Sequence, residues 1–173
     1  MLRRAPLFLS ASGLLLVSAS AVGTWAPRLI WNATGSAPEG LYALQPGAAL
    51  QVGELVAIRP PLLLAGWLDA RGYAPAGVVL VKSVAALAPS WICRQGAQVT
   101  VDGALVARAE PVDRWGRTLP IWSGCRRLGP DEIFLLNAAR GSLDGRYFGA
   151  LPRVAVVGRL SPIWLIRSAR HAG

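Results

Sequence analysis

The chain has 173 residues, 53% of them hydrophobic, and a formal net charge of +9 at pH 7, a length suited to one domain with a short appendage. Its single histidine, His171, excludes zinc sites built from several histidines, and a position so near the end disfavours a Ser-His-Asp triad. The arginines are scattered, with no recognisable nucleic-acid module around them, which argues against specific nucleic-acid binding. The P-loop and dinucleotide-binding motifs are also absent.

The N-terminal segment has the pattern of an exported segment. Arg3 and Arg4 precede an uncharged stretch, residues 5–27, whose apolar core is about 16 residues long, the lower limit for a spanning helix. Basic residues before an apolar run indicate its cytoplasmic flank. The small residues at 18–21 also fit a cleavage site, so a removed signal peptide is an alternative to a retained anchor.

We favour a retained transmembrane anchor over residues 1–27. Trp25 and Trp31 follow the apolar core, as in the aromatic belt at a membrane surface. With either alternative, residues 28–173 are expected to form a domain outside the cytoplasm.

A turn rich in glycine and proline comes next, with the sequence NATGSAPEGLYAL at residues 32–44. Ser36 lies between Gly35 and Ala37, and Pro38 and Gly40 follow it. A turn alone explains the glycines and the proline. A serine held in a rigid turn is also a candidate nucleophile, so both interpretations stay open here.

The rest of the chain is typical of a mostly β domain with antiparallel strands. Residues 62–73 have the one convincing helical pattern, ending near Gly72. Asp102-Gly103, between alternating apolar residues, predicts a tight hairpin. Apolar stretches rich in valine and isoleucine alternate with turn signals, and we expect strands within 40–44, 54–61, 77–87, 97–107, 132–137 and 153–164.

Lys82 is the only lysine among 18 basic residues, and it lies in an apolar stretch, GVVLVKSVAAL. A desolvated lysine has a lowered pKa and can act as a base, a role closed to arginine. The alternative is a strand lysine that points to solvent. Together, Ser36 and Lys82 would form a serine–lysine dyad, which can carry out acyl transfer without histidine.

Cys93 and Cys125 are the only cysteines. In an exported domain, two cysteines are more often a disulfide than a metal or redox pair. Two unpaired buried thiols are the alternative.

Three motifs, in order, resemble a known family. SAPEGLY is similar to the S-x-P-x-G-[LI]-Y box around the nucleophile of bacterial signal peptidases, in the form found in the conjugative-transfer TraF peptidases. VLVKSVAAL resembles their lysine box and SLDGRYFGAL their terminal box, and the similarity covers residues 32–164. Two segments depart from the family: LAPS stands where L-P-G-D is usual, and LLNAARGS where G-D-N or S-D-N is usual.

The resemblance implies a signal-peptidase-like catalytic domain with Ser36 as nucleophile and Lys82 as general base. Asp144 matches an aspartate counted among the functional residues of TraF peptidases. Thr34 matches an oxyanion-hole position, Ser142 a serine that orients the lysine, and Arg146 a supporting basic residue. For Asp144 and Arg146, a purely structural salt bridge is compatible with the functional interpretation.

The resemblance also implies a function. We expect a serine endopeptidase without cofactor, anchored in the inner membrane with its catalytic domain on the periplasmic side. TraF peptidases mature a conjugative pilin, which some systems cyclise, so the expected partners are a propilin-like precursor, membrane lipid and the conjugative transfer machinery. The alternatives are a general signal peptidase and a catalytically inactive structural component of a conjugative secretion channel.

Overall fold

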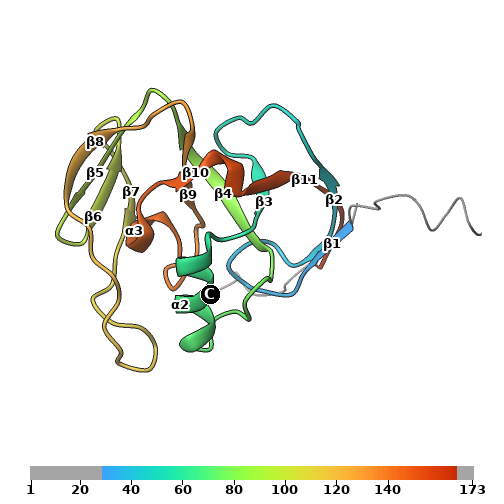
Figure 1. Ribbon diagram of the computed structural model, residues 1–173, viewed down its shortest axis with the longest axis horizontal. Helices are drawn as coiled ribbons and strands as arrows, with labels where there is room; N and C mark the ends of the chain where they lie inside the picture. Colours follow the sequence, from blue (N-terminus) through green and yellow to red (C-terminus); the bar gives the residue numbers. More distant parts are fainter. Residues whose placement is uncertain (1–28, 167–173) are drawn as a thin grey trace, which may run out of the picture.

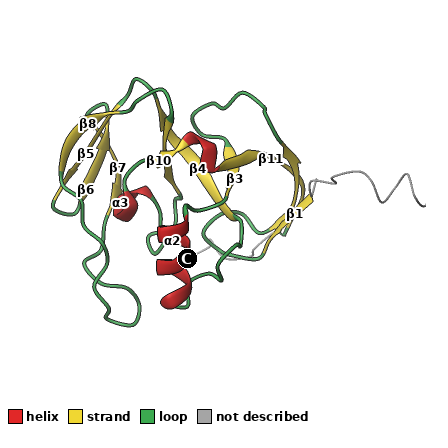
Figure 2. Ribbon diagram, viewed as in Figure 1, coloured by secondary structure: helices red, strands yellow, loops and turns green. Residues whose placement is uncertain are grey.

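The computed structural model describes residues 29–166, so the predicted anchor at 1–27 lies outside the described residues (Figure 1). Within this part of the chain, no helix is long and apolar enough to cross a membrane. Two antiparallel β-sheets and a few short helices make up the domain, which confirms the expected mostly β class (Figure 2).

The larger sheet has seven strands in the order β1-β2-β11-β3-β4-β9-β10. Their bounds are β1 Leu29–Asn32, β2 Gly40–Gln45, β3 Leu55–Ile58, β4 Leu80–Leu87, β9 Glu132–Leu136, β10 Leu151–Pro152 and β11 Val156–Leu165. β4 lies between β3 and β9, with Lys82 opposite Val56 in the register of β3. The central position of β4 puts the lone lysine inside the domain.

The smaller sheet has the order β7-β6-β5-β8, with β5 Trp91–Gln95, β6 Gln98–Val101, β7 Ala104–Arg108 and β8 Gly124–Arg127. Asp102 and Gly103 join β6 to β7 with φ angles of 48° and 84°, so the predicted hairpin is confirmed. Cys93 and Cys125 are directly opposite each other on β5 and β8 and form a disulfide. The alternative of two unpaired thiols is therefore wrong.

The helices are short: α2 Leu62–Ala70, α3 Gly145–Phe148 and the 3-10 turn η1 Arg153–Ala155. The predicted helix over 62–73 is present but ends at Ala70. Arg71 follows as its C-cap, and Gly72 has a φ of 68°, a left-handed value that continues no helix. α2 lies beside the middle of the larger sheet (Figure 1).

Strand β9 joins the two sheets into one core. Ile133 and Leu135 pack against β3, whereas Phe134 and Leu136 pack in the cluster that includes side chains of β5 and β6. Both faces are therefore covered, which explains the nearly continuous apolar sequence EIFLL. Burying side chains of this size stabilises the fold by about 1.5–3 kcal/mol each. Asn137, which directly follows β9, is thereby buried at the edge of this core.

Candidate active site

Ser36 lies half-buried in the turn between β1 and β2, and Asn32 holds this turn from inside. Asn32 ends β1 and is buried; its Nδ2 lies 3.1 Å, 3.1 Å and 3.0 Å from the carbonyl oxygens of Thr34, Ala37 and Pro38. Its Oδ1 accepts hydrogen bonds from the amide and the hydroxyl of Thr34. One buried amide thus contacts three carbonyl oxygens and one N–H of the turn.

Gly40 closes the turn where β2 meets β11. Its φ is 152°, and a Cβ built on it would lie 2.2 Å from the carbonyl oxygen of Trp164. Any other residue would therefore push β11 away from β2. Tyr42 adds a second support, because its hydroxyl donates a 2.6 Å hydrogen bond to the carbonyl oxygen of Pro38. The glycine and proline that follow Ser36 thus belong to a rigid turn.

Lys82 is buried, with 6% of its surface exposed, so the alternative of a solvent-facing strand lysine is wrong. Its Nζ donates a 3.0 Å hydrogen bond to Ser142 Oγ. Burial lowers the pKa of Lys82 to about 8, the charge of Asp144 opposes this shift, and the charge of Arg146 adds to it. A large fraction of Lys82 is therefore uncharged in mildly alkaline solution.

Helix α2 supplies part of the apolar cover that desolvates Lys82. Leu64 and Leu68 of this helix line a cavity of about 10 Å³ together with Lys82 and Asp144. This volume is at the lower limit for a single water molecule, so bulk water does not reach the ammonium group from this side. The helix therefore contributes to the desolvation of the lone lysine.

Asn137 links the serine turn to the lysine strand. Its Nδ2 donates to Ser36 Oγ at 3.3 Å and to the carbonyl oxygen of Val81, the neighbour of Lys82, at 3.1 Å. Within residues 29–166, no hydrogen bond joins Ser36 Oγ directly to Lys82 Nζ. Catalytic hydrogen bonds are often long in substrate-free enzymes and shorten when substrate binds. The two candidate groups are thus held on neighbouring segments by one amide.

Two buried asparagines, Asn32 and Asn137, were missed by the sequence analysis. Asn137 also accepts a 3.0 Å hydrogen bond from the Ser83 amide on Oδ1 and donates its own backbone N–H to Asp144 Oδ2 at 2.9 Å. The available signal was its position, a single polar residue directly after the apolar run EIFLL. Asparagine is common in turns and after strands, so this signal does not distinguish a buried connector from a loop residue.

Asp144 and Arg146 form a buried ion pair. Arg146 Nε donates to Asp144 Oδ1 at 2.8 Å, and Arg146 Nη2 donates to Asp144 Oδ2 at 3.1 Å. The same Nη2 donates to the carbonyl oxygen of Asn137 at 2.6 Å. Asp144 also caps α3, where Gly145 is required because a Cβ would lie 2.6 Å from Phe134 Cε2. Arg146, paired with Asp144, therefore holds the backbone carbonyl oxygen of Asn137 in place.

The structure brings the predicted residues into one region. Thr34 Oγ1 lies 3.4 Å from Ser36 Oγ, and Ser142 lies beside Lys82. The cysteine pair lies apart, in the smaller sheet. Among residues 29–166, no group of three or more histidine, cysteine, aspartate or glutamate side chains is arranged to hold a metal ion. The arrangement can therefore supply a hydroxyl, an amine of lowered pKa and several hydrogen-bond donors.

Comparisons with known proteins agree on one family. A probable conjugal transfer protein TraF of Sinorhizobium fredii is 35% identical over 163 residues, covering 84% of either chain. The conjugal transfer protein TraF of Agrobacterium fabrum is 30% identical, covering 91% of this chain and 93% of that protein. A plasmid transfer protein TraF of Escherichia coli is 31% identical, covering 88% of this chain and 94% of that protein.

A crystal structure of a signal peptidase I from Enterococcus faecalis is 15% identical, with a TM-score of 0.39 over 66% of this chain and 98% of that chain. The family model described as signal peptidase, peptidase S26, matches residues 1–165. Because this model matches most of the chain and the TraF relatives are at least 30% identical, the chain belongs to the signal peptidase family, peptidase S26, and to its TraF-type conjugative-transfer members.

Proposed function

We propose that this protein is a serine endopeptidase in which Ser36 is the nucleophile and Lys82 the general base. One observation carries the proposal: a serine in a rigid turn and a buried lysine with a lowered pKa lie on two segments that Asn137 joins. A neutral amine next to a positioned hydroxyl is the pairing that a serine–lysine mechanism needs.

The reaction begins with proton transfer. Uncharged Lys82 Nζ takes the proton of Ser36 Oγ, which attacks the carbonyl carbon of the scissile peptide bond. The tetrahedral intermediate collapses, the C–N bond breaks, and the leaving amine takes a proton from Lys82. A water molecule then attacks the acyl-enzyme ester while Lys82 accepts its proton, and Ser36 is released with its hydroxyl restored.

Two groups in the turn are available to stabilise the oxyanion. The backbone N–H of Ser36 has no hydrogen-bond acceptor within the described residues. The Thr34 hydroxyl donates to Asn32 Oδ1 at 2.8 Å in the substrate-free state, so it must rotate to serve the oxyanion. Rotation leaves Asn32 Oδ1 with the Thr34 amide, at 3.2 Å, as a remaining donor. We expect the backbone N–H to contribute more, because it is already free.

Asp144, Arg146 and Ser142 are assigned supporting roles. Ser142 Oγ holds the amine of Lys82, and the Asp144–Arg146 pair holds Asn137. The charge of Asp144 also keeps the pKa of Lys82 from falling further. These residues therefore position the dyad and adjust its proton affinity rather than react themselves.

A membrane-facing surface fits the proposed location at the periplasmic side of the inner membrane. Trp31 and Trp164 are 51% and 59% exposed, and their ring centroids are 5.9 Å apart. Leu29, Ile163 and Leu165 are exposed nearby on the same two strands, β1 and β11. Exposed tryptophans beside aliphatic side chains are typical of a membrane–water interface. The Ser36 turn follows β1 directly, so substrates would be cut close to the bilayer.

The proposed substrate is a propilin-like exported precursor, which is what the resemblance to TraF peptidases implies, and relatives carry the name conjugal transfer protein. The test is to co-express the full-length chain with a conjugative propilin or with an ordinary secretory precursor, and to weigh the products. Ser36→Ala and Lys82→Ala should abolish processing, whereas the control Ser161→Ala should not. A cyclic product is one water lighter than the corresponding linear one.

The outcomes separate the candidate functions. Unchanged processing in both dyad variants would contradict the peptidase and favour an inactive component of a conjugative secretion channel. Cleavage of the secretory precursor alone would favour a general signal peptidase. Cleavage of the propilin, lost in both variants, is the result that we expect.

A further inference from the structure

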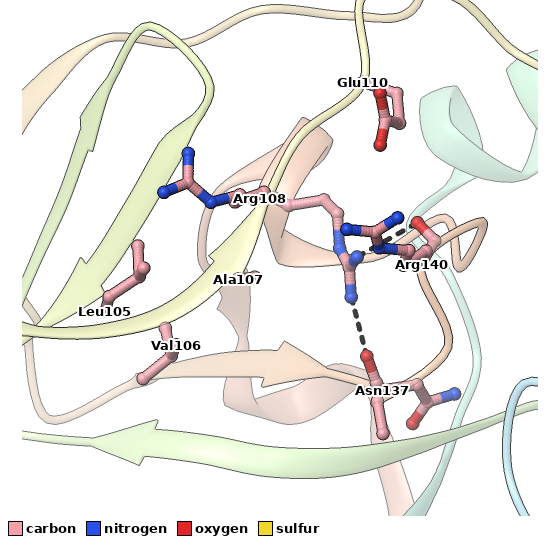
Figure 3. A pocket seen from close by; sticks show the side chains of 9 residues that line it. Leu105, Val106, Ala107, Arg108, Glu110, Asn137 and Arg140 are labelled. Carbon is pink, nitrogen blue, oxygen red and sulfur yellow. Dashed lines mark hydrogen bonds between the residues drawn. The ribbon is translucent and has the colours of Figure 1, made fainter.

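A cavity of about 240 Å³ opens beside Asn137 (Figure 3). One wall is strand β7, residues 105–108, and another is the segment that follows β9, including Arg140. None of the roles proposed above uses this cavity. Since Asn137 also donates to Ser36 Oγ, the cavity begins one side chain away from the candidate nucleophile.

Strand β7 presents an open edge to this cavity. It is the last strand of the smaller sheet and pairs only with β6. Successive side chains of a strand point to opposite faces, so a cavity over one face would be lined by alternate residues. Four consecutive residues of β7 line this cavity, which therefore runs along the edge of the strand. Leu105 and Val106 are 52% and 42% exposed, and a bulge interrupts the β6–β7 ladder at this point. Such an edge can pair with an added extended segment.

The cavity wall carries excess positive charge. Arg108 and Arg140 are exposed, and within residues 29–166 neither guanidinium group forms an ion pair or a hydrogen bond. The third arginine on the wall, Arg146, is neutralised by Asp144. Glu110 is the only acidic residue that lines the cavity. Two uncompensated guanidinium groups against one carboxylate favour an anionic ligand.

The position of β7 indicates which part of a substrate reaches the cavity. Strand β7 lies at one end of the domain, whereas β1 and β11, which bear the exposed tryptophans, lie toward the other end (Figure 1). A substrate chain bound at Ser36 can extend away from the tryptophans toward the cavity, because Asn137 both lines the cavity and contacts Ser36 Oγ. The occupant is therefore the membrane-distal part of the substrate.

We propose that this cavity binds an extended, acidic stretch of the polypeptide substrate on the membrane-distal side of the scissile bond. The substrate backbone pairs with the open edge of β7. An aspartate or glutamate side chain of the substrate contacts Arg140, and Arg108, whose guanidinium group points away from Arg140 (Figure 3), adds to the positive charge of the wall. The proposal rests on the proposed peptidase function for the identity of the ligand, but its binding step can be measured without cleavage.

The test uses the full-length Ser36→Ala chain in detergent and three fluorescein-labelled peptides. The peptides, Thr-Val-Asp-Val-Thr and its Asn and Lys counterparts, differ only in the central residue, and Asn has nearly the shape of Asp without its charge. By fluorescence anisotropy, the acidic peptide should bind about tenfold more tightly than the amide peptide, and the basic peptide should bind weakest. The acidic preference should fall as salt is raised.

The double substitution Arg108→Gln and Arg140→Gln should remove the preference for the acidic peptide. The carbonyl oxygen of Arg140 keeps its hydrogen bond from Arg146 Nη1, so the substitution leaves that contact in place. The double substitution Arg59→Gln and Arg153→Gln, at two exposed arginines outside the cavity, removes the same charge, so it is the matched control and should retain the preference.

Equal binding of the three peptides would overturn the proposal. An equal loss of the acidic preference in the control and in the Arg108→Gln, Arg140→Gln variant would also overturn it. The second result would mean that the net charge of the chain attracts acidic peptides without a site. If the wild-type chain cleaves no precursor but still shows the arginine-dependent preference, the proposed peptidase function fails, and the cavity remains a site for an acidic polypeptide that is not a substrate. If it cleaves precursors without the preference, only the cavity proposal fails.

Discussion

The side-chain amide of Asn137 lies 3.3 Å from Ser36 Oγ, although the two residues are 101 positions apart in the sequence. The same amide group reaches the carbonyl oxygen of Val81 and the amide of Ser83, on either side of Lys82. Asn137 therefore controls the distance between the serine turn and the lysine strand. Its own position depends on the Asp144–Arg146 pair, through its backbone N–H and carbonyl oxygen.

We expect Asn137→Ala to lower both stability and cleavage rate. The substitution leaves the carbonyl oxygen of Val81 and the N–H of Ser83 without their partner, which costs about 1–3 kcal/mol for each buried group. Ser36 Oγ loses its contact with the lysine strand, so kcat should fall more than KM rises. Urea unfolding and cleavage kinetics measure the two effects. Ala138→Gly, at the exposed neighbour, is a control, and wild-type kinetics in Asn137→Ala would contradict this role.

The cleavage rate should depend on pH through Lys82. Because burial lowers the pKa of this group to about 8, kcat/KM should rise about tenfold per pH unit below that value and level off above it. Lys82→Arg should be inactive at every pH, since arginine does not deprotonate in proteins. Initial rates between pH 6 and 10 test this expectation. A rate that is constant over this range would show that Lys82 is not the base.

Asp144→Asn should shift this pH profile to lower pH. The charge of Asp144 raises the pKa of Lys82, so its removal lets burial and Arg146 lower that pKa further. The substitution also leaves a buried guanidinium group without its counter-ion, which costs about 3–5 kcal/mol of stability. Rates are therefore measured only at temperatures where urea unfolding shows a folded variant. The exposed Asp131→Asn is the control, and an alkaline shift in Asp144→Asn would contradict the electrostatic assignment.

Lys82→Met should stabilise the fold at neutral pH while it abolishes cleavage. The folded-state pKa of about 8 lies below the ordinary value of 10.5, so the unfolded chain binds more protons between these values and wild-type stability rises with pH there. Methionine removes the cost of the buried charge, about 3 kcal/mol at pH 7. Thermal unfolding at pH 7 and 10 should show a gain that shrinks as pH rises. A gain that grows with pH would contradict the lowered pKa.

Much of the fold follows from local patterns in the sequence. The strand alternation of GLYALQ, the Asp102-Gly103 turn and the helix after Pro61 depend on neighbouring residues, so the sequence analysis predicted them correctly. β5 and β8, with the sequences WICRQ and GCRR, were not predicted. Every residue of β8 is exposed, so its strand conformation depends on pairing with β5 rather than on a buried face.

The candidate site was predictable to a similar extent. Ser36 and Lys82 could be selected because an unusual residue stood in an unusual context, a serine in a glycine–proline turn and a lone lysine in an apolar stretch. Asn32 and Asn137 could not, because asparagine is common in turns and after strands. Their importance comes from buried backbone groups that the fold brings to them, and no local pattern records these partners.

The disulfide should stabilise the smaller sheet without taking part in the reaction. Cys93 and Cys125 enclose a loop of 32 residues, and closing such a loop stabilises a fold by roughly 3–4 kcal/mol. The double substitution Cys93→Ser and Cys125→Ser should therefore lower the melting temperature by about 10 °C. β5 stays linked to the site region without the disulfide, because Arg94 Nη1 donates to the carbonyl oxygen of Arg146 at 2.6 Å. The cleavage rate well below the melting temperature should therefore change less than about twofold. Reducing agent should lower the melting temperature of the wild type and leave that of the double variant unchanged. Equal sensitivity of both proteins would show that the disulfide does not account for their difference in melting temperature.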